Sequence, residues 1–345
     1  MDQRDYVESL SPHDLQPDHE IKDMKDSDAV TSKKWLKRFR GANGALQWLC
    51  SNTRPDLAAD TSISAGTAGV GVTKNSILNA QKILRKAHSR IDVEVRIRHI
   101  RPEDLRFSAF HDAGWASRPD GSSQGGLMIF ACHKDLLDGK EAPLSLLEWK
   151  SWKLKRVCRS SLSAECQAMA EALDTLNFVR FFWEILTGRS KVMTKIDQDL
   201  ELTKAPTSGL ITDCKGLFDA VNRSQSAGLG LSEKRTAIEA LSIRQICSVS
   251  NVSVKWVNSD RQLADILTKQ GVLTENLDRA LRTNQWRIVF DSTFTSAKNL
   301  RKQKRENHFK KIKDPTSRVL LAELSSAEVE RLVGLVRGLR HDSLE

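Results

Sequence analysis

The chain has 345 residues, and its 54 lysines and arginines outnumber its 44 aspartates and glutamates, giving a formal net charge of +10. A hydrophobic content of 39% excludes a chain that is disordered throughout. The six cysteines form no CxxC pair or Cys/His cluster, which argues against a structural zinc site and a disulfide framework. We therefore expect an intracellular protein of the cytoplasm or nucleus. No apolar run approaches the roughly 20 residues that span a bilayer, so no membrane partner is expected.

The first 100 residues divide into two predicted segments. Residues 1–30 are polar and acidic, with little apolar surface to bury, and are predicted to be disordered. Residues 31–100 are predicted to be mainly helical, because apolar residues recur at helical spacing in 32–53 and again in 75–90. The stretch AGTAGVGV at 65–72 lacks the Lys-Ser/Thr ending of a phosphate-binding loop and is predicted to be a connection.

The pattern changes from helical spacing to alternation near residue 92. Three alternating or apolar runs follow closely at 104–113, 125–132 and 143–152, which predicts an antiparallel meander of strands. A long helix is expected at 162–186, followed by a polar insertion at 187–208.

Two more strands are expected beyond the insertion, at 209–212 and 252–258, separated by helices and followed by a helix at 261–269. A capping-box pattern, Ser259 followed by Gln262, predicts the start of this last helix. This order of elements is typical of an α/β protein with a mixed sheet flanked by helices.

The C-terminal segment 291–345 is predicted to be a basic tail with a short amphipathic helix at 325–339. Eight lysines and arginines lie between residues 298 and 313. Such a run could hold nucleic acid non-specifically, act as a nuclear address, or be solvated without a role.

Four carboxylates stand at similar places in the predicted elements. Asp112 ends the first strand of the meander, and Asp213 directly follows the strand at 209–212. Glu165 lies in the first turn of the long helix, on the stripe that should face the sheet. Asp265 lies early in the helix that follows the last strand. These placements predict that the four meet near one edge of the sheet.

Each of these carboxylates has a simpler explanation when it is considered alone. Aspartates after strands are often turn formers or helix caps, and an acidic residue in a first turn favours the helix dipole. A cluster of four, however, would repel itself strongly without cations. Mg²⁺ prefers carboxylate oxygens, water and phosphate oxygens as ligands. Two such ions about 3.5–4 Å apart can support phosphodiester hydrolysis.

Several segments resemble a known family. The stretches HDAGWASRPDGSSQGGLMIF, EWKSWKLKRVCRSSLSAECQAMAEAL, ITDCKGLFDAV and VKWVNSDRQLADILTK resemble, in order, the ribonuclease H domain of copia-type retrotransposon polyproteins. Upstream, GALQWLCSNTRPDLA and AQKILRKAH are similar to the end of the reverse transcriptase in the same polyproteins. The resemblance covers roughly residues 38–272.

This resemblance implies a ribonuclease H-like fold with a mixed five-stranded sheet flanked by helices, spanning 101–290 and preceded by a small helical segment. It implies a two-metal endonuclease, using Mg²⁺ or Mn²⁺, that cuts the RNA strand of an RNA/DNA hybrid. The family's catalytic and metal-binding carboxylates correspond to Asp112, Glu165, Asp213 and Asp265. No YxDD-like polymerase motif occurs, so a separate reverse transcriptase chain is a predicted partner.

Departures from the family pattern leave alternatives open. No histidine lies between Asp213 and Asp265, where some ribonucleases H carry one that helps product release, and Asp213 comes 48 positions after Glu165. One alternative is a catalytically inactive, domesticated or decaying retroelement remnant that binds nucleic acid. Another is an integrase-like strand-transfer enzyme, which the order of the carboxylates disfavours.

A basic and aromatic stretch at 148–161 leads directly to Glu165 and is predicted to bind nucleic acid. The alternative is an edge strand that lysines protect from aggregation. Trp115 is expected to pack beneath the site. The predicted nucleic-acid contacts are Ser123, Gln124, Lys150, Trp152, Lys153, Lys155, Arg156 and Arg159.

Overall fold

The computed structural model describes residues 2–69, 71–188, 202, 205–222, 231 and 233–288. Contacts divide the chain into two units, Met1–Phe290 and Asp291–Glu345, and the described residues all belong to the first. The predicted basic tail and its helix, and most of the 187–208 insertion, lie outside the described residues.

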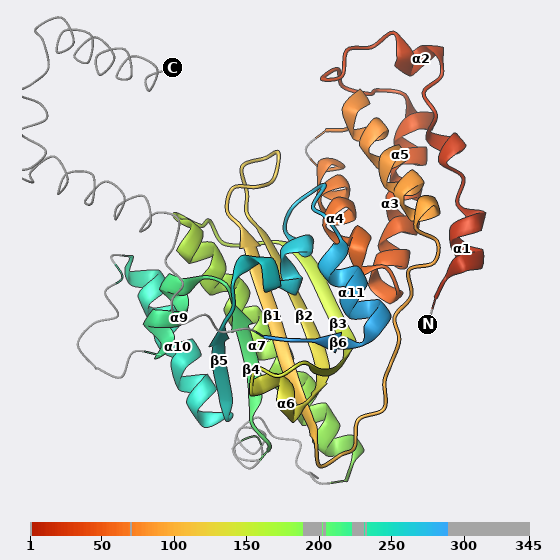
Figure 1. Ribbon diagram of the computed structural model, residues 1–345. Coiled ribbons are helices and arrows are strands. Elements are labelled where there is room, and N and C mark those ends of the chain that lie inside the picture. Colours follow the sequence, from red (N-terminus) through yellow and green to blue (C-terminus); the bar gives the residue numbers. More distant parts are fainter. Residues whose placement is uncertain are drawn as a thin grey trace, which may run out of the picture. The chain divides into compact units, whose positions relative to one another are not determined.

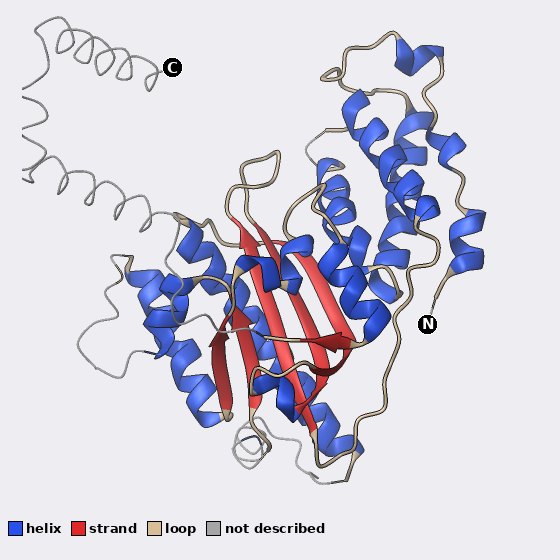
Figure 2. Cartoon of the chain, in the orientation of Figure 1, coloured by secondary structure: helices blue, strands red, loops and turns tan. Residues whose placement is uncertain are grey.

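A mixed sheet forms the centre of the first unit (Figures 1 and 2). Strands β1 (Leu105–Gly114), β2 (Gln124–His133) and β3 (Ala142–Lys153) form the predicted antiparallel meander. Strands β4 (Ser208–Thr212) and β5 (Val252–Trp256) extend it in parallel beside β1. The strand order β5-β4-β1-β2-β3-β6 confirms the predicted α/β class and is compatible with a ribonuclease H-like fold. Five strands were expected; the sixth, β6 (Gln285–Trp286), is a two-residue addition beside the start of β3.

Helices cover one face of the sheet. Helix α7 (Ser161–Leu186) lies across β1 and β2, with α9 (Lys215–Asn222) and α10 (Lys234–Val249) beside it (Figure 1). Side chains alternate along a strand, so Ala109 of β1 faces α7 while Phe110 faces the other way. Met169 and Leu173 of α7 pack in the same core as Ala109, which orients the helix face that carries Glu165.

The opposite face carries short turns and the N-terminal helices. The predicted helix at 261–269 is instead two 3-10 turns, η3 (Ser259–Arg261) and η4 (Leu263–Leu267), and η4 lies against β1 and β2. Further helices α6 (Lys134–Leu137) and α11 (Glu275–Thr283) border β3. The predicted helical segment contains α3 (Lys33–Asn52), η2 (Pro55–Leu57), α4 (Ala58–Thr67) and α5 (Lys74–Ser89).

The predicted disorder of residues 1–30 is wrong. This segment contains α1 (Arg4–Ser9), η1 (Pro12–Leu15) and α2 (His19–Lys22), and four of its apolar side chains, Val7, Leu15, Ile21 and Val30, are buried. Both α1 and η1 contact α5, so a tertiary surface that local composition does not reveal supplies the burial. The alternation after residue 92 also forms no strand, although the backbone N–H of Arg98 donates to Ser145 Oγ.

Among the described residues, no helix has the length and apolar character needed to cross a membrane.

Candidate active site

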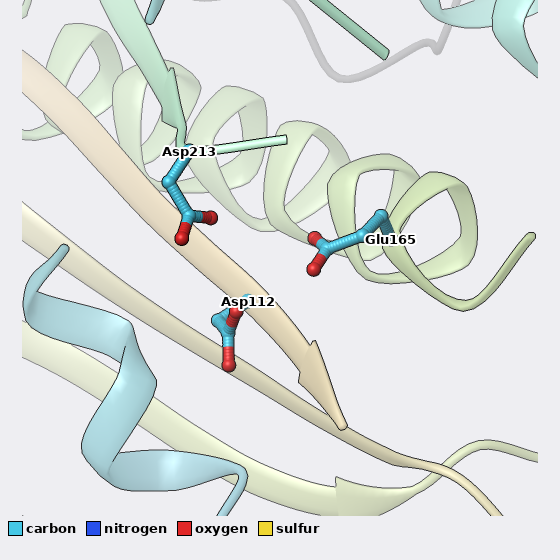
Figure 3. A group of neighbouring side chains, drawn as sticks. All are labelled: Asp112, Glu165 and Asp213. Carbon is cyan, nitrogen blue, oxygen red and sulfur yellow. The ribbon is translucent and has the colours of Figure 1, made fainter. Parts of the chain in front are cut away.

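Three of the four predicted carboxylates converge. Asp112 lies near the end of β1, Glu165 lies in the first turns of α7, and Asp213 directly follows β4. One ligand oxygen from each lies within 4.8 Å of the others, and Figure 3 shows the three side chains around a common point. Strands β1 and β4 are parallel neighbours, so their carboxyl ends meet at the same edge of the sheet.

Asp112 is almost completely buried, with 4% of its surface exposed. The Thr268 hydroxyl, just beyond η4, donates a hydrogen bond to Asp112 Oδ2. Burial and the neighbouring Asp213 raise the pKa of Asp112 to about 6. This carboxylate is therefore held where its charge is costly unless a cation offsets it.

Glu165 is also buried, with 8% exposed, and only one of its oxygens has a partner. Its Oε1 accepts the backbone N–H of Ala113 at 3.3 Å, whereas Oε2 is buried without a hydrogen-bond donor among the described residues. Burial, followed by the charges of Asp112 and Asp213, raises the pKa of Glu165 well above its usual value. An unpartnered buried carboxylate oxygen beside two further carboxylates suits a hard divalent cation.

Asp213 is half-buried and is held by residues of β5 and of η3, the turn that follows β5. The Ser259 hydroxyl donates to Asp213 Oδ2 at 2.7 Å, and the Trp256 indole N–H donates to the Asp213 carbonyl at 3.1 Å. The predicted capping box is therefore absent, because both side chains bond elsewhere. The Ser259 hydroxyl bonds to Asp213, and the Gln262 amide donates to the His111 carbonyl at 2.8 Å. Both side chains tie the turns after β5 to the site.

Asp265, the fourth predicted carboxylate, is not part of the group of three. Its side chain forms an ion pair with Lys269. Burial alone would lower the pKa of Lys269, but the charges of Asp112, Asp265 and Asp213 outweigh it and the net shift is upward. The ammonium group of Lys269 therefore acts on the same carboxylates that a metal ion would neutralise.

His111 is a site neighbour that the sequence reasoning missed. It is completely buried, its Nδ1 lies 3.7 Å from Glu165 Oε2, and neither ring nitrogen has a hydrogen-bond partner in the described part of the chain. Burial lowers the pKa of His111 to about 3, so the ring is neutral at physiological pH. Its position directly before Asp112 was the available signal, because alternation places its side chain on the face of β1 that Ala109 shares and that α7 covers.

The predicted basic contacts fall into two groups. Lys150, Lys153 and Arg156 are exposed, but each pairs with a carboxylate: Glu171 at 2.5 Å, Asp120 at 2.6 Å and Glu239 at 2.7 Å, respectively. Lys155 and Arg159 are exposed and form no ion pair with any described residue. Their role in binding nucleic acid stays a prediction.

The other predicted contacts have internal partners. Gln124 is completely buried and bonds to Ser62, Ser151 and Arg118. Ser123 is buried and accepts the backbone N–H of Ala116 at 3.0 Å. Trp152 is half-buried beneath Lys150, whose ammonium lies 5.1 Å from its ring centre. Ser123 and Gln124 therefore shape the loop after β1 from within.

No protein-family model matches the chain. Among solved structures, one similar chain is the foamy viral protease-reverse transcriptase in complex with an RNA/DNA hybrid, at 13% sequence identity and a TM-score of 0.30. The match covers 56% of this chain and 26% of that one, so this chain spans about a quarter of that protein's length. A likeness at this level establishes no shared fold, and the fold assignment rests on the strand order.

Proposed function

We propose that the chain is a metal-dependent ribonuclease H that hydrolyses the RNA strand of an RNA/DNA hybrid. The observation that carries the proposal is the convergence of Asp112, Glu165 and Asp213 from three separate elements, with one buried oxygen of Glu165 unpartnered. A cluster of this kind is costly to fold, and a purely structural role gives no reason to retain it.

The proposal extends to origin and partners. The motifs around the carboxylates support descent from a copia-type retrotransposon polyprotein, with 31–100 derived from the end of its reverse transcriptase and 101–290 forming the ribonuclease H-like part. The expected partners are an RNA/DNA hybrid and a separate reverse transcriptase chain.

The donor set suits divalent cations, which prefer carboxylate oxygens, and the proposal is that two Mg²⁺ or Mn²⁺ ions bind there. When bound, such ions supply a water nucleophile at neutral pH and stabilise the leaving oxygen of the phosphodiester. Asp112, Glu165 and Asp213 would hold them, and Asp265 would join if it left Lys269.

The surrounding residues hold the carboxylates in position. The Thr268 hydroxyl orients Asp112, the Ser259 hydroxyl orients Asp213, and the Ala113 N–H orients Glu165. Burial of Asp112 and Glu165 lowers the local dielectric, which strengthens the interaction of both with a cation. The side chains are thus preorganised before substrate arrives, which is the main protein contribution to electrostatic catalysis.

The test uses the purified full chain and a hybrid labelled differently on each strand, with Mg²⁺ or Mn²⁺ and, in parallel, EDTA. We expect metal-dependent cleavage of the RNA strand alone, and its loss in Asp112→Asn and Glu165→Gln. The matched control is Asp219→Asn, because Asp219 is an exposed residue of α9 that pairs with Lys215. Binding of the hybrid without cleavage under either ion would instead favour the inactive, nucleic-acid-binding remnant.

A further inference from the structure

Trp115 lies three residues beyond Asp112, in the loop after β1, and 50% of its surface is exposed. The expected packing beneath the site is therefore wrong. Its indole N–H donates to the backbone carbonyl of Cys158 at 3.0 Å. The polar atom of the ring is thus occupied, and what the side chain offers to a partner is an apolar aromatic surface.

The loop that carries Trp115 is held firmly on both sides. Ala116 has a positive φ of 50°, which is uncommon for a residue with a side chain, and its N–H donates to Ser123 Oγ at 3.0 Å. Ser117 Oγ donates to the Gly114 carbonyl at 2.9 Å. A Cβ at residue 114 would lie only 2.4 Å from Ser117 Oγ, so this close approach requires glycine. Fixing an exposed side chain before binding reduces the entropy that binding must remove.

The residue that anchors Trp115 belongs to the loop between β3 and α7, which leads to Glu165. Cys158 Sγ accepts a hydrogen bond from Gln167 Nε2 of α7 at 3.2 Å. Lys155 and Arg159 stand on either side of Cys158 in this loop, both exposed and both without an ion pair among the described residues. Val157, between them, is 91% exposed.

The ion pairs show which basic residues near the site are available to bind phosphate. Lys150, Lys153 and Arg156 have carboxylate partners, so a phosphate would have to compete with an existing ion pair. Lys155 and Arg159 carry positive charge with no such competitor among the described residues, and both lie in the loop that leads into α7, the helix that carries Glu165. Uncompensated cations next to an exposed aromatic ring are the usual components of a nucleic-acid surface.

We infer that Trp115, Lys155 and Arg159 form the surface that positions the hybrid over the carboxylates, an inference that rests on the proposed function. The indole packs against ribose in the wide, shallow minor groove that A-form-like duplexes present. Lys155 and Arg159 bind backbone phosphates. The three are positioning residues, and their effect is on binding.

The binding experiment uses the full chain in the Asp112→Asn background, so that the hybrid stays intact, and follows the fluorescence anisotropy of a labelled RNA/DNA hybrid with Mg²⁺. Trp115→Ala should weaken binding about tenfold, within the range that loss of one aromatic contact produces. Trp115→Phe, which keeps a ring, should recover most of that loss. Trp48→Ala is the matched control, because Trp48 is 58% exposed on α3 and is far along the chain from this loop.

Salt dependence tests the two cations. Lys155→Gln and Arg159→Gln should each reduce the slope of log Kd against log salt by about one, as expected for loss of one phosphate contact. Lys82→Gln, at an exposed lysine of α5 that forms no ion pair with any described residue, should leave the slope unchanged. Thermal midpoints equal to that of the parent protein would show that each variant is folded.

The outcomes separate this inference from the proposed function. Unchanged binding in Trp115→Ala, or unchanged slopes in both cation variants, would overturn the inference even if the wild type cleaves the hybrid. Conversely, tight binding that depends on these three residues, together with no cleavage by the wild type, would support the surface and overturn the nuclease.

Discussion

Lys269 and Asp265 form an ion pair one turn apart, next to the three converging carboxylates. The pair gives Asp265 a partner within the protein, and the ammonium group also acts on Asp112. The site therefore divides into three carboxylates that form no direct ion pair with a lysine or arginine of the described residues, and one, Asp265, that does.

This division predicts unequal effects on metal binding. Asp213→Asn should weaken Mn²⁺ binding at least tenfold, because it removes a member of the group of three. Asp265→Asn should weaken it by no more than about threefold, since Lys269 already neutralises Asp265. Calorimetric titration of the metal-free protein measures both. A loss in Asp265→Asn as large as that in Asp213→Asn would show that Asp265 leaves Lys269 to bind the ion.

Asp112 should make the metal-free protein less stable as pH rises. Its folded pKa, about 6, lies above the value of about 3.9 that an unfolded aspartate has. Between these values the folded state binds the extra proton, so this group's contribution to the free energy of unfolding falls from about pH 4 to pH 6 and stays low above it.

Thermal midpoints in EDTA at pH 4.5 and pH 7.5 test this effect. The wild type should lose more stability across the interval than Asp112→Asn, which cannot ionise, and Asp112→Asn should be the more stable of the two at pH 7.5. Mn²⁺ should raise the midpoint of the wild type and have little effect on the variant. Parallel pH profiles for the two proteins would contradict the assigned cause.

Breaking a buried ion-pair network should destabilise the helical segment strongly. Asp56 is completely buried and accepts Arg54 Nε at 2.8 Å, Arg54 Nη2 at 2.9 Å and Arg90 Nε at 3.2 Å. Asp56→Asn leaves buried guanidinium charge uncompensated and should cost about 3–5 kcal/mol in the free energy of unfolding. Asp219→Asn, at an exposed pair, should cost at most about 1 kcal/mol. Urea denaturation measures both, and similar losses would mean that water reaches Arg54.

Gly126 allows η4 to lie close against β2. A methyl group there would lie 2.6 Å from Leu267 Cβ and 2.9 Å from Thr268 Cγ2, so Gly126→Ala should push the turn away and separate the Thr268 hydroxyl from Asp112. We expect a loss of about 1–3 kcal/mol in stability, the usual cost of overpacking, together with weaker Mn²⁺ binding. Gly41→Ala is the control: Gly41 has open space in α3, and the change should stabilise the protein by about 0.5–1 kcal/mol. Unaltered metal binding in Gly126→Ala would show that the turn adapts.

Local sequence pattern was sufficient for the main elements and for three site residues. Alternating or apolar runs predicted β1, β2 and β3, and helical spacing placed Glu165 on the face of α7 that meets the sheet. Asp112 and Asp213 followed from the ends of their strands, because neighbouring parallel strands present their carboxyl ends at one edge. These features depend on periodicity within a few residues, which can be read from the sequence alone.

Tertiary packing decided the rest. Asp265 stands in a motif that resembles the family's, yet its oxygen reaches Lys269 in place of the other carboxylates, since the position of η4 depends on contacts with β2 that no local pattern encodes. Tertiary contacts also bury Ile21, although the segment around it is too polar to predict order. Trp115 stays half exposed, with its indole N–H bonded to the Cys158 carbonyl in a loop that is distant in sequence. Burial and pairing arise between segments far apart in the chain, so only the folded structure determines them.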